Sequence, residues 1–258
     1  MDESVYDSWV DIYDLLYSGF TEDIQFYVDE ALTAKGTVLE LGCGTGRVSL
    51  PIALQGVNLT CLDISRGMIG ALERRIDASS DLSQPLRIVH GDMRNFSFNE
   101  KFDLIIIPFR SFLCLLSVED QVRTLINIKR HLSNKGKLIL NFFVPDLQTM
   151  NQEGDLSNHL FDVTDPKTGG RLVVWNQTKC NMHTQILDTR LIIEILNNDD
   201  VMTKRLYRDL QLRYVYRWEM YHLLRYCGYN MIDLYGDFNR TSFDGESEEM
   251  IWIASPCH

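Results

Sequence analysis

Short runs of largely apolar residues alternate with helix-like patterns through the first half of the chain. The runs cover residues 37–41, 59–62, 86–89, 104–107 and 138–143. Runs of four to six apolar residues without strict alternation are typical of strands buried on both faces, as in a parallel sheet covered by helices. The pattern therefore predicts a doubly wound α/β fold.

Helical patterns lie before and between these runs. Apolar and aromatic residues recur at spacings of three and four over residues 4–32, which predicts two helices with a break near Ser18 and Gly19. After the fourth run, residues 117–120 have the sequence Ser-Val-Glu-Asp, a capping-box pattern. We expect a helix that begins there and stops at 134–136, where the sequence is Asn-Lys-Gly.

The second half of the chain has a different pattern. Residues 146–170 are polar and rich in Asp, Asn, Gln and Gly, which is typical of a loop or linker. Three strand-like stretches predict an inserted antiparallel β platform, at 172–178, 185–196 and 202–216. A helix expected at 217–227 ends at Gly228, and two final strands are expected at 231–235 and 250–254.

Length and charge limit the possible functions. A chain of 258 residues with 45% hydrophobic content is long enough for one sizeable core, so we expect a single domain. The formal net charge is -11, which opposes the approach of RNA or DNA. An acidic surface suits a small neutral or cationic ligand better, although it also serves simply to keep a protein soluble.

The chain shows no sequence signal for export, membrane insertion or metal binding. Its first residues, MDESVYDSWVDIYD, are acidic where a signal peptide is basic, and no apolar run approaches the ~20 residues that span a bilayer. The six cysteines form no C-x-x-C pair, and the histidines are too scattered for a zinc site. We expect a cytoplasmic protein with reduced thiols.

A glycine-rich turn follows the first predicted strand, in the sequence VLELGCGTGRV (38–48). Glycine lets the backbone turn tightly and approach a ligand, and the N-terminus of the following helix presents unpaired N–H groups. The dinucleotide fingerprint needs a small residue where Arg47 stands, so a dinucleotide fits poorly. Glu40 beside the loop suits an uncharged nucleoside whose amino-acid tail carries an ammonium group.

Aspartates follow the next two predicted strands. Asp63 ends the second strand, 21 residues after Gly42, where a carboxylate can accept hydrogen bonds from both hydroxyls of an unphosphorylated ribose. Asp92 lies just beyond the third strand in HGDMRNF (90–96). Because ligands bind at the carboxyl edge of open α/β sheets, the loop and both aspartates are expected to face one site.

These motifs resemble those of class I S-adenosylmethionine-dependent methyltransferases of the small-molecule type. ELGCGTG is similar to the family's cofactor loop, LDIS with Met68 to its ribose segment, and GDMRNF to its adenine segment. FDLIIIPFRSFLCL (102–115) is similar to the fourth strand, and the resemblance spans essentially the whole chain. It implies S-adenosyl-L-methionine as the cofactor and a mostly parallel, seven-stranded, Rossmann-like sheet whose antiparallel seventh strand is 250–254.

The resemblance also divides the chain into working parts. We expect a single methyltransferase domain, 1–258, made of an N-terminal helical lid (1–36), a cofactor-binding core (37–145), an inserted loop with antiparallel strands for the acceptor (146–217), and a C-terminal helix with the last two strands (218–258). The residues implied in cofactor binding are Tyr13, Tyr17, Glu40, Gly42, Cys43, Gly44, Gly46, Arg47, Asp63, Ile64, Met68, Gly91, Asp92, Met93 and Pro108.

The acceptor side carries weaker signals. Methyl transfer is an in-line displacement, so the protein mainly aligns the acceptor, excludes water and, for a protonated acceptor, removes a proton. Some related amine methyltransferases have a histidine near the place of Cys114, and this chain lacks it. The candidate catalytic residues are His222, Glu219 and Tyr214, and the candidate acceptor-binding residues are Phe109, Arg110, Ser111, Cys114, Phe143, Arg213, Tyr216, Arg217 and Arg240.

The sequence favours a methyltransferase that acts on a small-molecule N or O acceptor, without nucleic-acid or membrane partners, as a monomer or homodimer. Three alternatives stay open. One is a nucleic-acid or protein methyltransferase, which the charge disfavours. Another is an NAD-dependent oxidoreductase, which Arg47 argues against. The third is a non-enzymatic protein that uses its cofactor pocket as a sensor or partner surface.

Overall fold

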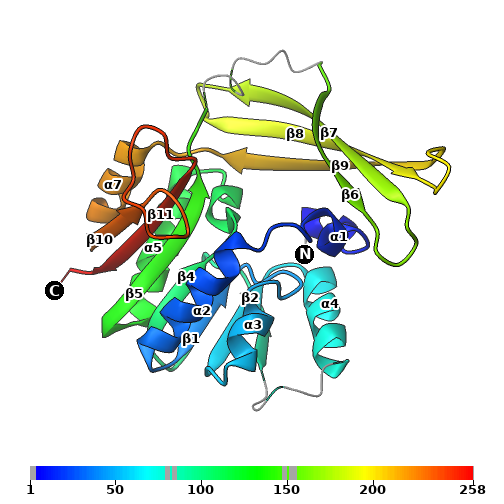
Figure 1. Cartoon of the computed structure of the whole chain (residues 1–258). Helices are drawn as coiled ribbons and strands as arrows, with labels where there is room; N and C mark the ends of the chain where they lie inside the picture. Colours follow the sequence, from blue (N-terminus) through cyan, green and yellow to red (C-terminus); the bar gives the residue numbers. More distant parts are fainter. Residues whose placement is uncertain (1–3, 79–81, 83–85, 147–149, 151–155, 258) are drawn as a thin grey trace.

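The computed structural model describes residues 4–78, 82, 86–146, 150 and 156–257, and these form a seven-stranded sheet and a four-stranded sheet (Figure 1). The strands of the larger sheet are, in spatial order, β3 (Arg87–His90), β2 (Leu59–Asp63), β1 (Val38–Leu41), β4 (Phe102–Ile107), β5 (Leu132–Phe143), β11 (Glu249–Pro256) and β10 (Tyr229–Tyr235). Neighbours from β3 to β5 pair in parallel, and β11 is antiparallel to both β5 and β10. The predicted mostly parallel sheet is confirmed.

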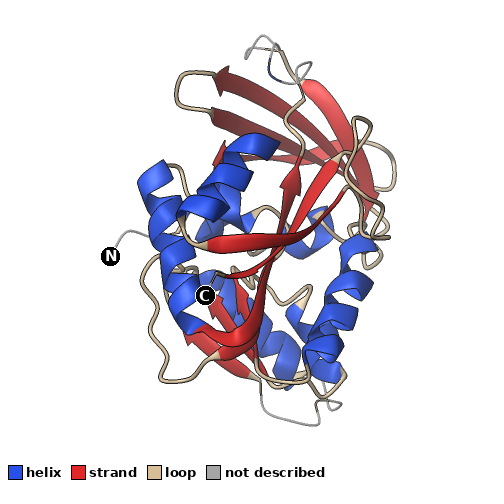
Figure 2. Cartoon of the chain, turned by 90° about the vertical axis from the view of Figure 1, so that its left-hand side faces the viewer, coloured by secondary structure: helices blue, strands red, loops and turns tan. Residues whose placement is uncertain are grey.

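Successive residues of the central strands face two different cores. In β4, Leu104 and Ile106 pack in one core, whereas Ile105 and Ile107 pack in the other. One core is covered by α2 (Glu22–Ala34), α3 (Ser49–Leu54) and α4 (Arg66–Asp77), and the other by α5 (Val118–His131) and α7 (Arg217–Tyr226). Figure 2 shows helices on both sides of the sheet. Burial on both faces explains why the apolar runs lack alternation.

Helix α5 begins as predicted and ends earlier. The Ser117 hydroxyl accepts a hydrogen bond from the backbone N–H of Asp120 at 3.1 Å, which caps the first turn. The expected stop at 134–136 is wrong, because the helix ends at His131 and β5 begins at the next residue. Leu132 is buried and pairs with Phe102 of β4, so strand pairing ends the helix before the glycine.

The inserted segment forms a separate antiparallel sheet, which we call the platform. It consists of β6 (Asn158–Thr164), β7 (Arg171–Asn181), β8 (Ile186–Leu196) and β9 (Met202–Arg213), in that order. The prediction of a loop through residues 146–170 is wrong for β6, because this polar stretch pairs with β7 as an edge strand. An edge strand with mostly exposed side chains lacks the apolar signal from which strands are predicted.

The N-terminal segment, residues 5–17, packs between the platform and α4 (Figure 1). It contains a short 3-10 helix, η1 (Val5–Ser8), and one helical turn, α1 (Tyr13–Leu16). Trp9, Ile12 and Leu16 are buried in a cluster with the inner face of the platform and with Met68 of α4. The predicted break near Ser18 and Gly19 is confirmed, although the helix before it is divided into these two pieces.

Within the described residues, every helix is too short or too polar to cross a lipid bilayer.

Candidate active site

The glycine loop after β1 follows a tight, left-handed path. The φ angles of Gly42, Gly44 and Gly46 are 76°, 55° and 87°, a region that other residues adopt at a cost. A Cβ atom at Gly42 would lie 2.8 Å from the Ser111 side chain, and one at Gly46 would lie 2.3 Å from Leu72. A Cβ atom at Gly44 would meet nothing within 4 Å, so the loop is open to a ligand at that residue.

A cavity lies at the carboxyl ends of β1 to β4, between the glycine loop, the N-terminal segment and the platform. This is the edge at which open α/β sheets bind ligands. The described residues that line it are Tyr6, Tyr13, Tyr17, Gly42, Gly44, Leu62, Asp63, Ile64, Met68, Gly91, Asp92, Met93, Arg94, Phe109, Arg110, Ser111, Cys114, Leu115, Asp120, Leu210 and Leu212. The structure thus brings ten of the candidate cofactor residues to one place.

The other five candidate cofactor residues lie behind the lining of the cavity. Cys43 is buried beneath the loop, and Gly46 packs against α4. Arg47 forms a two-pronged ion pair with Asp23 of α2 at 2.5 and 2.6 Å, and its guanidinium lies 4.6 Å from the centre of the Phe109 ring. Pro108 accepts a hydrogen bond from Ser111, and Glu40 accepts one from Ser49. These contacts support the shape of the loop.

Burial raises the pKa of Glu40 to about 8, although the hydrogen bond from Ser49 and the charge of Arg47 act in the opposite direction. Its carboxyl group is therefore largely neutral at pH 7. A raised folded-state pKa means that the unfolded chain loses this proton at a lower pH than the folded one. The stability that the protonated group contributes is complete below its ordinary pKa of 4.5 and is lost as the pH rises through 8.

We predict that Glu40→Gln removes this part of the pH dependence. The variant amide keeps an oxygen that accepts the Ser49 hydrogen bond and has no proton to lose. The melting temperatures of the cofactor-free proteins should agree near pH 5, and the variant should melt several degrees higher by pH 8, on the order of 5 °C. A constant difference between the two proteins from pH 5 to pH 8 would contradict the prediction.

Asp63 at the end of β2 joins the glycine loop to α4. Its Oδ2 accepts a hydrogen bond from Gly44 N at 2.8 Å, and its Oδ1 accepts one from Ser65 N at 2.8 Å. Burial raises the pKa of this carboxyl group despite those two hydrogen bonds. Each carboxylate oxygen has a second lone pair, so Asp63 can still accept from two hydroxyl groups in the cavity.

Three tyrosines of the N-terminal segment cover the cavity. Tyr13 packs against Tyr17 with ring centroids 4.8 Å apart, and against Tyr6 at 6.3 Å. Burial raises the pKa of Tyr17 to about 12, and it also raises the pKa values of Tyr6 and Tyr13 well above their ordinary value. These hydroxyl groups stay protonated at physiological pH, so they serve as hydrogen-bond donors and apolar walls.

Hydrogen bonds tie this tyrosine cover to the core. Asp7 Oδ1 accepts from the Ser65 hydroxyl at 2.6 Å and from Gly67 N at 2.8 Å. The Thr45 hydroxyl of the glycine loop donates to Asp14. The same segment packs on the platform, so the cavity is closed from three sides by parts of the chain that are distant in sequence.

The turn after β4 supplies four of the candidate acceptor-binding residues. Phe109 and Arg110 both have positive φ angles, 52° and 69°, and η2 (Ser111–Cys114) follows them. Asn141 holds this strained turn, since its side-chain oxygen accepts from Phe109 N at 2.9 Å and its backbone oxygen from Arg110 N at 3.2 Å. Phe109, Arg110, Ser111 and Cys114 all line the cavity.

The other acceptor-side candidates lie outside the described lining of the cavity. Arg213 is buried and binds Gln121, Gln185 and Glu219, which makes Glu219 part of a structural ion pair. His222 and Glu219 line a shallow surface groove beside α5 and α7. Tyr214 is buried near Cys180, and the Tyr216 hydroxyl contacts Met150. The Arg110 guanidinium lies over the Phe143 ring, and that of Arg217 lies over the rings of Trp218 and Phe243. Arg240 pairs with Glu30. Of these residues Arg213 and Tyr214 are buried, whereas Tyr216, Arg217 and His222 are exposed.

The cavity also has lining residues that the sequence patterns did not predict as site residues. The hydroxyl oxygen of Tyr6 lies 3.6 Å from the sulfur of Cys114. Leu210 and Leu212 reach the cavity from β9. Arg94 and Asp120, which form an ion pair at 3.0 Å, also line the cavity. Arg94 belongs to GDMRNF, and Tyr6 belongs to the aromatic pattern of the N-terminus. Both residues therefore lie in sequence patterns from which a place in the site could have been predicted. The platform leucines carried no such signal, because only tertiary packing brings them there.

A doubly wound sheet with a glycine loop after β1 and a carboxylate at the end of β2 defines a nucleoside-binding α/β enzyme domain. Comparison with known proteins narrows this class. A family model described as a methyltransferase domain matches residues 38–136. Cypemycin N-terminal methyltransferase of Streptomyces sp is 30% identical over 195 residues, which are 74% of this chain and 76% of that protein. Glycine/sarcosine N-methyltransferase of Aphanothece halophytica is 32% identical over 126 residues, 48% of this chain and 46% of that protein.

Solved structures of methyltransferases share the whole fold. The CcbJ methyltransferase from Streptomyces caelestis has a TM-score of 0.80 at 21% identity, with 100% of both chains covered. CalS10, an amino pentose methyltransferase from Micromonospora echinaspora, has a TM-score of 0.73 at 16% identity, with 95% of this chain and 96% of that chain covered. The chain belongs to the class I S-adenosylmethionine-dependent methyltransferases, and its cofactor is S-adenosyl-L-methionine.

Proposed function

We propose that this enzyme transfers the methyl group of S-adenosylmethionine in line to an amine nitrogen of a small molecule. The observation that carries the proposal is one cavity that joins the glycine loop to a chamber walled by tyrosines and by leucines of β9. Among the described residues that line it, the acids are Asp63, Asp92 and Asp120, and histidine is absent.

The cavity residues fit the cofactor in a definite order. The open face of Gly44, with Gly42 beside it, leaves room for the methionine tail, and Asp63 has lone pairs free for the ribose hydroxyls. Asp92 and Met93 offer an acceptor and an apolar surface to the adenine. This order leaves Tyr6, Cys114 and the two leucines, Leu210 and Leu212, for the acceptor.

The chain's own groups favour nitrogen over oxygen as the acceptor atom. S-adenosylmethionine supplies an electrophilic methyl group on a sulfonium. A hydroxyl acceptor needs a base near neutral pH, and burial raises the pKa of Cys114 as well as those of the three tyrosines. A neutral amine already has a nucleophilic lone pair. The enzyme then contributes alignment and the exclusion of water, which are large effects on their own.

The relatives support this choice, since the names of three refer to an amino group, an N-terminus or an N-methyl transfer. The net charge of -11 suits a neutral or cationic acceptor and opposes a nucleic acid.

We further propose that residues 1–36 act as a lid, that 37–145 bind the cofactor, that 146–217 shape the acceptor chamber and that 218–258 complete the sheet. A cytoplasmic location follows from the proposed use of a metabolic cofactor.

The test is a methyl-transfer assay with a panel of small primary and secondary amines, read by mass spectrometry as products heavier by one methylene group. We predict that the rate rises about tenfold per pH unit below the acceptor's own pKa and levels off above it, because only the free amine reacts. Two acceptors of different basicity should give midpoints that differ accordingly. The Cys114→Ala variant serves as the control and should keep these midpoints.

Two outcomes would contradict the proposal. One is the same midpoint for both amines, since it would indicate a titrating group of the enzyme. The other is methylation confined to hydroxyl compounds.

A further inference from the structure

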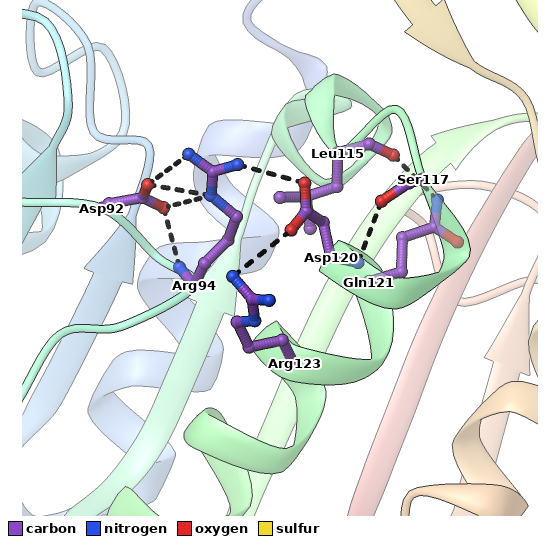
Figure 3. Close-up of polar contacts among 7 residues, drawn as sticks. All are labelled: Asp92, Arg94, Leu115, Ser117, Asp120, Gln121 and Arg123. Atoms are coloured by element: carbon purple, nitrogen blue, oxygen red, sulfur yellow. Dashed lines mark hydrogen bonds and ion pairs between the residues drawn. The ribbon is translucent and has the colours of Figure 1, made fainter.

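A chain of alternating charges runs through Asp92, Arg94, Asp120 and Arg123, and Figure 3 shows the contacts between them. Arg94 Nε lies 3.0 and 2.8 Å from the two carboxylate oxygens of Asp92, and Arg94 Nη2 lies 2.6 Å from Oδ2. Arg94 Nη1 then donates to Asp120 at 3.0 Å, and Arg123 lies 3.8 Å from the other oxygen of Asp120. Asp92, Arg94 and Asp120 all line the cavity. We call these three residues the charged wall.

The charged wall fixes the Asp92 carboxylate and leaves it little freedom. The Arg94 backbone N–H donates to Asp92 Oδ1 at 2.8 Å, while Oδ2 accepts the shorter guanidinium contacts, from Nε at 2.8 Å and from Nη2 at 2.6 Å. Because Arg94 Nε carries a single hydrogen and lies nearer Oδ2, both lone pairs of Oδ2 are used and the free acceptor capacity is concentrated on Oδ1. A fork of guanidinium hydrogen bonds sets the plane of a carboxylate as well as its position. Asp92 therefore presents an acceptor of fixed direction to the cavity.

Asp120 holds Arg94 from the other side. It lies in the first turn of α5, where its backbone N–H is capped by Ser117, and its side chain is 24% exposed. Burial opposes the ionisation of Asp92, but the hydrogen bonds and charge of Arg94 outweigh it and lower the pKa of Asp92. The carboxylate thus stays ionised and remains an acceptor without donor character over the neutral pH range.

We infer that Arg94 and Asp120 are positioning residues that make the site select a 6-amino purine over a 6-oxo purine. The inference rests on the proposed placement of adenine against Asp92. A fixed carboxylate accepts a hydrogen bond from the exocyclic amino group of adenine and repels the carbonyl oxygen that hypoxanthine has at the same place. A carboxylate released from Arg94 can rotate toward the N1–H group of hypoxanthine, and the selection is lost.

The experiment compares two ligands, S-adenosylhomocysteine and its 6-oxo counterpart, S-inosylhomocysteine, by calorimetric titration. We expect the wild-type protein to prefer the adenine ligand by at least about 100-fold, because a site built to accept an amino hydrogen rejects the analogue that lacks it. Arg94→Gln should reduce the ratio of the two dissociation constants to below about 10, and Asp120→Asn should reduce it to an intermediate value. The ratio is the decisive readout, since a general loss of structure weakens both ligands alike.

Arg123→Gln is the matched control, because Arg123 is exposed and lies 3.8 Å from the Asp120 oxygen that does not accept from Arg94. It should keep the wild-type ratio. A wild-type ratio near one would refute the placement of adenine against Asp92, and the inference with it. A wild-type preference that Arg94→Gln and Asp120→Asn both keep would overturn the inference alone and leave the proposed cofactor site standing.

Discussion

Asp63→Asn is expected to weaken the binding of S-adenosylhomocysteine by at least about 100-fold, since two hydrogen bonds to a charged acceptor contribute about 1.5–3 kcal/mol each. The asparagine amide has only one acceptor oxygen. Its NH2 group would face the backbone N–H of Gly44 or that of Ser65, both of which now donate to Asp63 at 2.8 Å. The substitution therefore removes ribose binding and disturbs the glycine loop together. Calorimetric titration measures the loss directly.

Asp103→Asn is the matched control for this experiment. Asp103 also accepts hydrogen bonds, from Thr37 N at 3.3 Å and from the Ser133 hydroxyl at 2.7 Å, but it lies near the amino end of β4, away from the cavity. We expect the dissociation constant of S-adenosylhomocysteine for the Asp103→Asn variant to stay within about twofold of the wild-type value. If the Asp63 variant bound the ligand as tightly as the Asp103 variant, Asp63 would not contact the ribose.

Gly44→Ala and Gly46→Ala are expected to fail in different ways, although both residues have positive φ angles. An alanine methyl at residue 46 would lie 2.3 Å from Leu72 in the core, so this variant should melt about 5–10 °C lower. A methyl at residue 44 meets no protein atom within 4 Å, so this variant should lose only about 2–4 °C, from backbone strain. The open space is where we place the methionine tail, and ligand binding should weaken about 10- to 100-fold.

The comparison is made by thermal melting without ligand and by titration with S-adenosylhomocysteine below both melting temperatures. Gly19→Ala is a control, because its added methyl also meets no atom within 4 Å and the residue lies in the turn before α2. That variant should match the wild-type protein in both measurements. Equal ligand affinity for Gly44→Ala and the wild-type protein would show that the open face of the loop does not hold the cofactor.

The core of the fold was predictable because each part carries a local signal. The β4 run from Leu104 to Ile107 is buried on both faces, and Ser117 caps α5 in the predicted way. The glycine loop and Asp63 were equally legible, since a backbone with positive φ and a carboxylate at a strand end require particular residue types. The edge strand β6 was not predictable, because its mostly exposed side chains leave little pattern.

The acceptor side of the site was the least predictable part. Arg213 and Glu219 were candidate site residues in the sequence, and in the structure the buried Arg213 pairs with the partly exposed Glu219 at 2.7 Å and joins β9 to α7. Conversely, Leu210 and Leu212 look like ordinary strand residues, and they line the cavity. Which face of the platform meets the core depends on how two sheets pack around the N-terminal segment. No local pattern encodes that arrangement, whereas the motifs of the cofactor loop are local.

The central claim is that one cavity holds the adenosyl thioether between Asp63 and the tyrosine cover, with its sulfur toward the platform. A crystal structure with S-adenosylhomocysteine tests it most directly. We predict ribose hydroxyls within hydrogen-bond distance of Asp63, the adenine beside Asp92, and the sulfur facing Tyr6 and Cys114. A ligand whose ribose lies away from Asp63, or whose sulfur faces the charged wall, would contradict it.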